Sequence, residues 1–292
     1  MDTTRKLGRN DLIASSYTLS GAGVFELPRF SFRERVAAAA QAGFAGIGVA
    51  IEDYAALRHQ GTSDRELRAI LDDHGVVAAE LEFLTDWWWD DERGRQARVA
   101  EERCYAAANA FGTRHVNVGS PGARGTLPPL TTVAAHFGAL CDRAAQQGLL
   151  VAFEFLPWTD IPDAATAGEL IRAADRPNGG ILIDTWHYFR GAANPAQVRA
   201  IPPERFFLIQ FDDADATMQG GWMEDTVNYR RLPGEGAFDL GGFIRMLDQH
   251  GVDAPFSVEI LSREQRLLPV GEAARRAHDS SRAVINRARA TP

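Results

Sequence analysis

Four polar side chains each interrupt an apolar run of the kind that forms a buried β-strand. They lie in VAFEFLPW, LIDTWH, FLIQFDD and FSVEIL, and they are Glu154, Asp184, Gln210 and Glu259. A carboxylate within a buried run destabilises the fold unless it is paired, hydrogen-bonded or bound to a metal ion. An arginine or a backbone N–H could satisfy any one of these groups alone, but a shared divalent metal ion accounts for all four together.

The chemistry of these four groups limits the ion that they would bind. Three carboxylates and one amide oxygen form an all-oxygen set, which favours Mn²⁺ or Mg²⁺ over a structural zinc site, with Co²⁺ or Zn²⁺ as alternatives. An ion with open positions can bind two substrate oxygens side by side, polarise a carbonyl and acidify the neighbouring C–H. We therefore expect one divalent metal ion used for chemistry next to a carbonyl group.

Short β-like runs alternate with amphipathic helical stretches along the chain, a pattern typical of βα units in a parallel sheet. The predicted strands are residues 13–21, 46–51, 76–84, 115–120, 149–156, 180–186, 205–213 and 255–261. The predicted helices are residues 31–43, 63–75, 92–112, 131–148, 163–174, 194–200, 239–250 and 272–290, with Ser31, Ser63 and Asp163 as N-caps. Because no linker divides residues 1–292, the sequence predicts a single α/β domain, a (β/α)₈ TIM barrel rather than an open doubly wound sheet. Active-site groups then gather at the carboxyl ends of the strands.

The composition favours a small-molecule partner. The 292 residues carry a formal net charge of −8 and have a pI near 5.4, so we expect no binding to nucleic acid or to an anionic membrane surface. The two cysteines, Cys104 and Cys141, fall in helical segments and offer no disulfide framework. No apolar run approaches membrane-spanning length and the first residues lack a secretory signal pattern, so a cytoplasmic protein is expected.

The motifs FEFLPW, IDTWH and VEI, with a polar residue on the seventh strand, resemble the sugar phosphate isomerase/epimerase-like family, the xylose isomerase-like TIM barrels, across nearly the whole chain. The resemblance implies that the four polar residues bind one divalent metal ion, and that Glu154 and Glu259 flank the substrate. Many members have histidine where this chain has Gln210, although glutamine also occurs, notably among dehydroshikimate dehydratases. The resemblance further implies a homo-oligomer.

Residues that follow the strand ends also match the family. His187 follows Asp184 in a D-x-x-H pattern, which implies substrate contact or proton transfer, and an imidazole can serve either near neutral pH. In the segment 213–238, RRLPGEG resembles a family loop in which an arginine faces substrate oxygens or a phosphate. Arg231 is the predicted substrate-binding residue, with Arg230 as its rival. A solvated Pro-Gly turn would explain the same segment.

Two further features bear on substrate binding. Glu82 lies near the mouth end of the third strand, where it is expected to bind a substrate hydroxyl or support a metal ligand, unless it forms an interior ion pair with Arg114 or Arg231. The run TDWWWDDERGR should expose a tryptophan or place one in the pocket. Trp186 is expected to contact the substrate as one of several aromatic residues near strand ends; these are Phe25, Trp158, Trp186, Trp222 and Tyr229. Packing of the loops would give the same composition.

The expected activity is that of a metal-dependent isomerase or epimerase acting on a keto-sugar or keto-polyol. Glu154, Glu259 and His187 are the expected catalytic residues, which exchange the proton on the carbon next to the carbonyl through an enediolate. The alternative is a dehydratase or lyase on a cyclic keto-polyol of the inosose or 3-dehydroshikimate type. An abasic-DNA endonuclease would need several histidine ligands, and a non-catalytic binding protein would not need the four proposed ligands.

Overall fold

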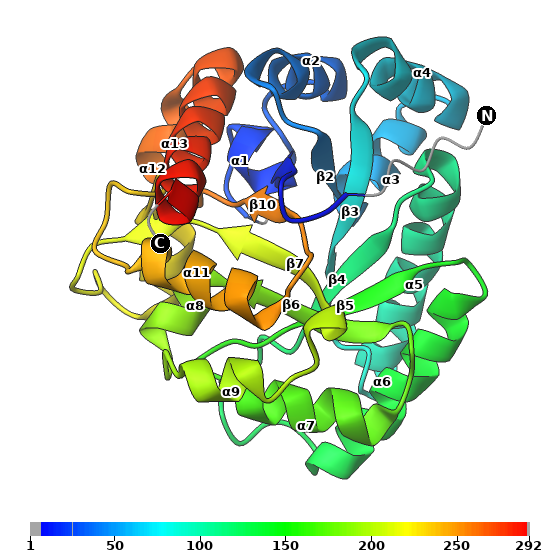
Figure 1. The fold of residues 1–292 in the computed structure, drawn as a ribbon. Helices are drawn as coiled ribbons and strands as arrows, with labels where there is room; N and C mark the ends of the chain where they lie inside the picture. The colour runs from blue at the N-terminus through cyan, green and yellow to red at the C-terminus, as the bar shows by residue number, and fades with distance from the viewer. Residues whose placement is uncertain (1–6, 25, 291–292) are drawn as a thin grey trace.

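A closed barrel of parallel strands forms the centre of the molecule, and helices surround it (Figure 1). The computed structural model describes residues 7–24 and 26–290. The barrel strands are β1 (Leu12–Ala14), β2 (Gly46–Ala50), β3 (Val77–Leu84), β4 (His115–Gly119), β5 (Leu150–Glu154), β6 (Gly179–Asp184), β7 (Phe206–Phe211) and β10 (Phe256–Val258). Strand β1 pairs in parallel with both β10 and β2, which closes the ring. The predicted (β/α)₈ barrel is confirmed.

The helices predicted from the sequence all occur outside the barrel. They are α2 (Phe32–Ala42), α4 (Asp64–His74), α5 (Glu92–Phe111), α6 (Leu130–Ala145), α7 (Ala164–Ala174), α9 (Pro195–Arg199), α11 (Leu240–His250) and α13 (Val270–Ala290). The side chains of Ser31, Ser63 and Asp163 accept hydrogen bonds from first-turn N–H groups, so the predicted N-caps are confirmed. Among the residues described, no helix is both long and apolar enough to cross a lipid bilayer.

The sequence did not predict the short helices near the barrel ends. These are α1 (Ser16–Ser20), α3 (Ile51–His59), α8 (Thr185–Arg190), α10 (Trp222–Asn228), α12 (Arg263–Leu267) and a 3₁₀ turn at Pro203–Arg205. The segment predicted as one long loop, 213–238, contains α10 between two short antiparallel strands, β8 (Asp213–Ala214) and β9 (Arg230–Arg231). This hairpin fixes the orientation of the two adjacent arginines.

The first predicted strand, residues 13–21, is wrong beyond Ala14. The chain leaves the sheet at Ser15, whose side chain accepts a hydrogen bond from the Tyr17 N–H and caps α1, and Gly21 ends that helix with φ 67°. Serine side chains satisfy backbone groups locally and so compete with the sheet for them. As a result Ser15 and its neighbours lie over the carboxyl end of the barrel instead of extending β1.

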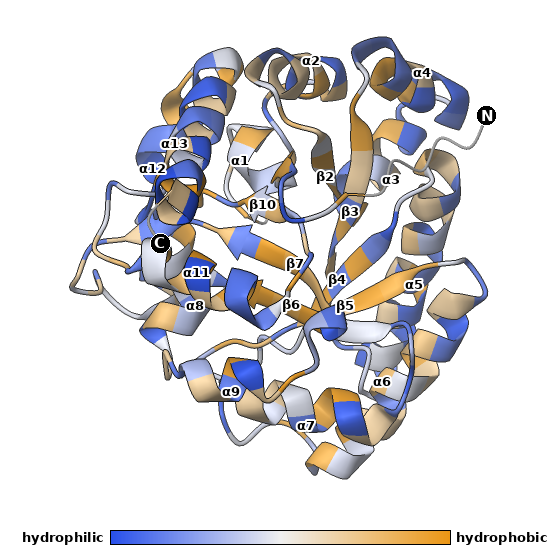
Figure 2. Ribbon diagram, in the orientation of Figure 1, coloured by the Kyte–Doolittle hydropathy of each residue, from blue (hydrophilic) through white to orange (hydrophobic). Residues whose placement is uncertain are grey.

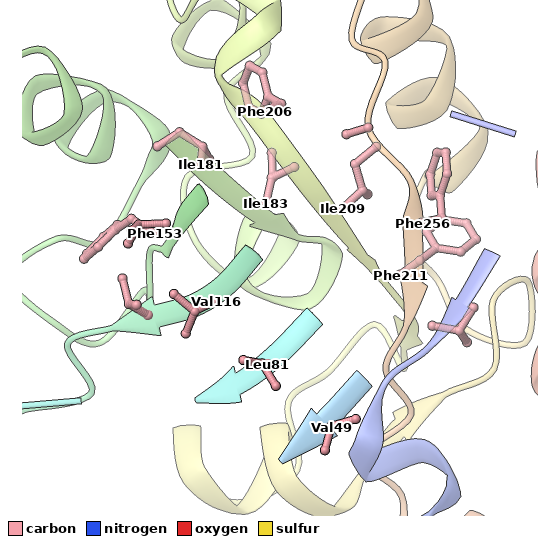
Figure 3. Close-up of a cluster of buried hydrophobic side chains, with 14 of the residues drawn as sticks. Val49, Leu81, Val116, Phe153, Ile181, Ile183, Phe206, Ile209, Phe211 and Phe256 are labelled. Carbon is pink, nitrogen blue, oxygen red and sulfur yellow. The ribbon is translucent and has the colours of Figure 1, made fainter. Parts of the chain in front are cut away.

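Alternation of side chains along the strands separates two apolar clusters. Ile181, Ile183 and Ile209 belong to the large cluster drawn in Figure 3, which packs between strands and helices. The intervening residues Leu182 and Leu208 belong to a second, smaller cluster. In Figure 2 the strands are largely orange, whereas the surrounding helices alternate between orange and blue. The core therefore lies mainly in the layer between barrel and helices.

The polar groups singled out in the sequence continue the second face of each strand. Glu154 lies two residues after Ala152, Asp184 two after Leu182 and Gln210 two after Leu208; Ala152, Leu182 and Leu208 all belong to the smaller cluster. Each of these polar residues is at or near the carboxyl end of its strand. The alternation that builds the core thus brings three of the four predicted metal ligands to one end of the barrel.

Gly180 in β6 lets neighbouring backbone approach closely. A Cβ atom there would lie 2.4 Å from the Arg205 carbonyl oxygen and 2.5 Å from the Phe207 ring. We expect Gly180→Ala to lower the free energy of unfolding by about 1–3 kcal/mol, because overpacking forces neighbours to shift. Urea unfolding measures this change. Gly271→Ala in α13, where no atom lies within 4 Å of the added Cβ, should not destabilise the protein. Equal unfolding midpoints for the two variants would contradict the close packing.

Candidate active site

A cavity of about 960 Å³ opens at the carboxyl ends of the strands. Glu82 from β3, Glu154 from β5, Gln210 from β7 and Glu259, directly after β10, line its inner end. Asp184 is 1% exposed at the end of β6, where the strand register aligns it with Gln210. The structure therefore places all four predicted metal ligands, together with Glu82, at one end of the barrel.

Asp184 connects strand β6 to the catalytic candidate His187. It is the N-cap of α8, and its Oδ1 accepts a hydrogen bond of 2.9 Å from the His187 N–H. The helix turn carries the imidazole back over the barrel, where Nε2 lies 3.1 Å from Glu154 Oε1. One ligand atom from each of Glu154, Asp184 and His187 lies within 4.8 Å of the others. The D-x-x-H pattern is thus a helix cap that fixes the position of the imidazole.

Gln210 and Glu259 are joined by a direct hydrogen bond. Gln210 Nε2 donates to Glu259 Oε1 at 2.9 Å, and Ser15 Oγ lies 3.1 Å from the same oxygen. The other end of the amide, Gln210 Oε1, is buried and has no hydrogen-bond partner among the described residues. A buried amide oxygen without a donor, beside several carboxylates, suits a cation. The residues present therefore fit a divalent metal ion bound through oxygen.

Arg230 is the cation within this cluster of acids. Its NH1 donates to Asp184 Oδ2 at 2.7 Å, to Glu259 Oε2 at 3.1 Å and to Asp212 Oδ2. The guanidinium is 1% exposed, and Nε donates to the Thr226 carbonyl oxygen. One buried arginine thus contacts three carboxylates at once.

Arg231 does not reach the cavity. Its guanidinium lies on the other side of the hairpin, 39% exposed, where it pairs with Asp215 at 3.1 Å and with Glu264 at 3.9 Å. Neighbouring residues on a strand face opposite ways, so the hairpin admits only one of the two arginines. Arg230, the alternative considered from the sequence, lines the cavity, and the predicted substrate-binding residue Arg231 does not.

Glu82 lines the cavity without forming an interior ion pair. Its Oε2 accepts a hydrogen bond from Ser15 Oγ and its Oε1 accepts one from the Ser16 N–H, both at 3.1 Å. Arg114, the partner considered from the sequence, instead donates to the Phe207 carbonyl oxygen. Glu82 is therefore held by the turn at the start of α1, with the carboxyl group at the wall of the cavity.

The acids differ in how their surroundings change their pKa values. Burial raises the pKa of Glu82 well above its ordinary value, and the charges of Glu80 and Glu259 raise it further. Burial likewise raises the pKa of Glu259 and of Asp212, although Arg230 opposes both shifts. Burial alone would raise the pKa of Asp184, but Arg230 and His187 outweigh it and hold that pKa below its usual range. The site therefore carries mutual repulsion that an additional cation would relieve.

The predicted aromatic contacts include both a structural residue and a residue that lines the cavity. Trp186 is fully buried and does not line the cavity; its Nε1 donates to Asp225 at 3.0 Å and its ring contacts His187 with centroids 5.2 Å apart. Trp158, in contrast, does line the cavity.

The triple-tryptophan run also packs into the protein. Trp87 and Trp88 are buried, and the Arg93 guanidinium covers the half-buried Trp89 ring at 3.6 Å. None of the three lines the cavity. Of the other aromatic residues named, Phe25 lies outside the described residues.

Sequence reasoning missed three residues of the site. Asp212 lies two positions after Gln210, so the alternation of the strand could have indicated it. Ser15 and Tyr17 were placed in a strand that does not exist beyond Ala14, and the Tyr17 side chain instead lines the cavity. Burial and the negative charges of nearby glutamates raise the pKa of Tyr17 well above its ordinary value.

Comparison with known proteins identifies the family. The sequence profile of the family described as xylose isomerase-like TIM barrel matches residues 36–284. The chain belongs to this family. The barrel and the cluster of acids at its carboxyl end agree with that membership.

Individual relatives include enzymes of two reaction types. A 3-dehydroshikimate dehydratase of Pseudomonas aeruginosa is 30% identical over 239 residues, which cover 81% of this chain but only 37% of the relative. An inosose isomerase of Halalkalibacterium halodurans is 26% identical over 150 residues, covering 51% of this chain and 52% of the relative. A solved structure of the IOLI protein with a binding zinc atom has a TM-score of 0.83 at 19% identity, covering 95% of this chain and 98% of that one. The chain thus spans well under half the length of the dehydratase, and the solved structure shares its fold.

The contacts of Arg230 predict a large effect of its removal on stability. Arg230→Gln would leave Asp184, Asp212 and Glu259 buried without a compensating charge, and we expect it to lower the free energy of unfolding by about 3–5 kcal/mol. The adjacent Arg231→Gln removes only a partly exposed pair and should lower it by less than about 1 kcal/mol. Denaturant unfolding of both variants without added metal measures the difference. Similar losses for the two variants would show that Arg230 does not neutralise the cluster.

Proposed function

We propose that the chain catalyses the metal-assisted dehydration of a cyclic keto-polyol. In this reaction a proton leaves the carbon next to a carbonyl and a β-hydroxyl group departs as water. The observation that carries the proposal is the pair formed by His187 and Glu154, with Nε2 3.1 Å from Oε1 at the cavity wall. A carboxylate that pairs with an imidazole within a cavity can take a proton from carbon while the imidazole supplies a proton to the leaving group.

The two ring nitrogens of His187 have different surroundings. Among the described residues Nδ1 is buried without a hydrogen-bond partner, whereas Nε2 lies 3.1 Å from Glu154 Oε1, to which its N–H can donate. In the proposed reaction the Glu154 carboxylate takes the α-proton, and the imidazolium of His187 gives its Nε2 proton to the departing hydroxyl oxygen, so that water leaves and the ring gains a carbon–carbon double bond. Transfer of the α-proton from Glu154 to Nε2 then restores both groups.

The hydrogen-bond partners that already occupy both carboxylate oxygens of Glu259 favour elimination over epimerisation. Epimerisation needs a second base on the opposite face of the reacting carbon, and Glu259 was the expected residue. Its Oε1 lies within hydrogen-bonding distance of Gln210 and Ser15, and its Oε2 accepts a hydrogen bond from Arg230. Since one acid–base pair suffices for loss of water, the less encumbered His187–Glu154 pair supports the dehydratase.

A divalent metal ion is part of the proposal, with Glu154, Asp184, Gln210 and Glu259 as the residues that would hold it. Mn²⁺ or Mg²⁺ suits this oxygen set, and Co²⁺ or Zn²⁺ are alternatives. When bound, the ion would polarise the carbonyl and stabilise the negative charge that develops as the proton leaves. The unpartnered Gln210 Oε1 and the repulsion among the acids support this assignment.

Isomerisation or epimerisation of a keto-polyol is the second candidate. Glu154 and Glu259 both line the cavity, and the inosose isomerase relatives match half of this chain. Product analysis separates the two reactions, because elimination forms a conjugated enone that absorbs ultraviolet light, whereas isomerisation conserves mass.

The proposed ligands predict the metal content. Protein purified without chelators should contain about one divalent ion per chain, and Glu154→Gln and Asp184→Asn should lose it, because each removes a charged oxygen ligand. Inductively coupled plasma mass spectrometry measures the content. Asp215→Asn, which alters the contacts of a partly exposed acid with Arg231 and Gln219, should keep the ion. A wild-type protein that holds no ion and cannot be loaded with one would refute the metal site.

The role of His187 predicts a loss of activity without a loss of metal. His187→Gln should lower kcat for dehydration by about 10²–10⁴-fold, because it removes the group that transfers the proton. The increase in ultraviolet absorption during turnover of 3-dehydroshikimate and of inososes measures this loss. His136→Gln, which alters a partly exposed histidine paired with Asp90, is the control. If His187→Gln instead loses the metal, His187 is a ligand rather than the proton donor.

A further inference from the structure

The cavity is larger and more apolar than a single polyol ring requires. Its volume of about 960 Å³ lies at the upper end of the range of about 300–1,000 Å³ typical of pockets for drug-sized ligands. The acids described above occupy only its inner end. The same cavity continues outward past α3, so a ring bound at the inner end would leave most of the volume empty.

Apolar residues also line the cavity, and we call five of them the outer wall: Ile51, Ala55 and Ala56 from α3, with Val227 and Leu261. Ala55 and Ala56 are partly exposed in the cavity, and their short side chains leave room beside the helix. Hydroxyl groups of a polyol would find few partners on these side chains, whereas an apolar group would gain from burial there.

The charges in the cavity disfavour an anionic substrate. Its described lining includes six acids, namely Glu26, Glu52, Asp53, Glu82, Glu154 and Glu259, and two arginines, Arg103 and Arg230; one of the acids, Asp53, is already paired with the buried Arg35. Arg230 already contacts three carboxylates, and Arg103 pairs with Glu52 at 3.2 Å near the solvent. Recognition of a carboxylate or a phosphate normally uses an arginine or lysine aimed at it. Within the described lining, both arginines are already bound to acids.

From these observations we infer that the substrate is an uncharged polyol ring that carries an apolar, aryl-sized substituent, and that the outer wall holds this substituent. The inference rests on the proposed dehydration for the placement of the ring at the inner end. It differs from that proposal in specifying the rest of the molecule: the substrate is neutral, unlike the acid 3-dehydroshikimate, and larger than a single ring.

Binding of unreactive probes tests the outer wall without turnover. Phenyl β-D-glucopyranoside has a polyol ring and an aryl group but no ketone, and methyl β-D-glucopyranoside lacks the aryl group. Isothermal titration of the metal-loaded protein should show roughly tenfold tighter binding of the phenyl compound, because burial of the aryl group against the outer wall is favourable. Equal affinities for the two compounds would overturn the inference.

Substitution of the small residues on α3 tests whether the preference for the phenyl compound arises at the outer wall. Ala56→Leu and Ala55→Leu preserve a good helix-forming residue but fill the outer part of the cavity, and at least one should abolish the preference for the phenyl compound. The near-isosteric Ala56→Ser should keep most of it. A preference that survives in both leucine variants places the aryl group elsewhere and overturns the assignment of the outer wall.

A negatively charged analogue of the phenyl glucoside tests whether the cavity prefers a neutral substrate. Phenyl β-D-glucuronide differs from the glucoside by a carboxylate and should bind roughly tenfold more weakly, because it meets an excess of acids. Equal or tighter binding of the glucuronide would overturn the neutral substrate. Dehydration is measured separately on a panel of keto-polyols that includes neutral, aryl-substituted rings as well as 3-dehydroshikimate and inososes. Protein that shows the phenyl preference but dehydrates no keto-polyol would refute the proposed function alone, and active protein without the preference would refute the outer wall alone.

Discussion

The constraint on which the site depends is the neutralisation of buried carboxylates by one guanidinium. Arg230 contacts Asp184, Asp212 and Glu259 inside the mouth of the barrel, where all four side chains are buried from solvent. Burial raises the pKa values of Asp212 and Glu259 despite this arginine, and the negative charge of Asp184 raises both further. The cluster thus keeps more carboxylates than cations, an excess that the divalent ion we propose would relieve.

The regular geometry of the barrel brings the members of this cluster together. Parallel strands in register place residues of one face at similar depth, and the polar positions of β5, β6 and β7 simply continue faces whose earlier residues are apolar. Residues in the first part of each of these strands therefore pack in the core, and residues near the carboxyl end contribute the polar groups of the site. The α1 turn completes the arrangement, since Ser15 lies within hydrogen-bonding distance of both Glu82 and Glu259.

The sequence predicted the barrel and the location of its polar end because both depend on periodicity. Apolar runs identified all eight barrel strands, and their polar interruptions indicated Glu154, Asp184, Gln210 and Glu259. Three errors had local causes that periodicity does not encode. Ser15 caps a helix within a segment that reads as a strand, a two-residue hairpin decides between Arg230 and Arg231, and the indole N–H of Trp186 finds Asp225 through tertiary contact. The roles of the site residues in catalysis remain predictions of chemistry.

Asp184 is at once the last residue of a strand, the cap of a helix and a member of the acid cluster. The distance between the cluster and the imidazole of His187 is therefore set by a single helical turn and not by a flexible loop. During divergence of such a protein, exchange of side chains could alter which substrate is accepted while this spacing persists. A reaction that needed the imidazole on another face of the ring would require insertion or deletion between residues 184 and 187, a much rarer event that would also destroy the cap.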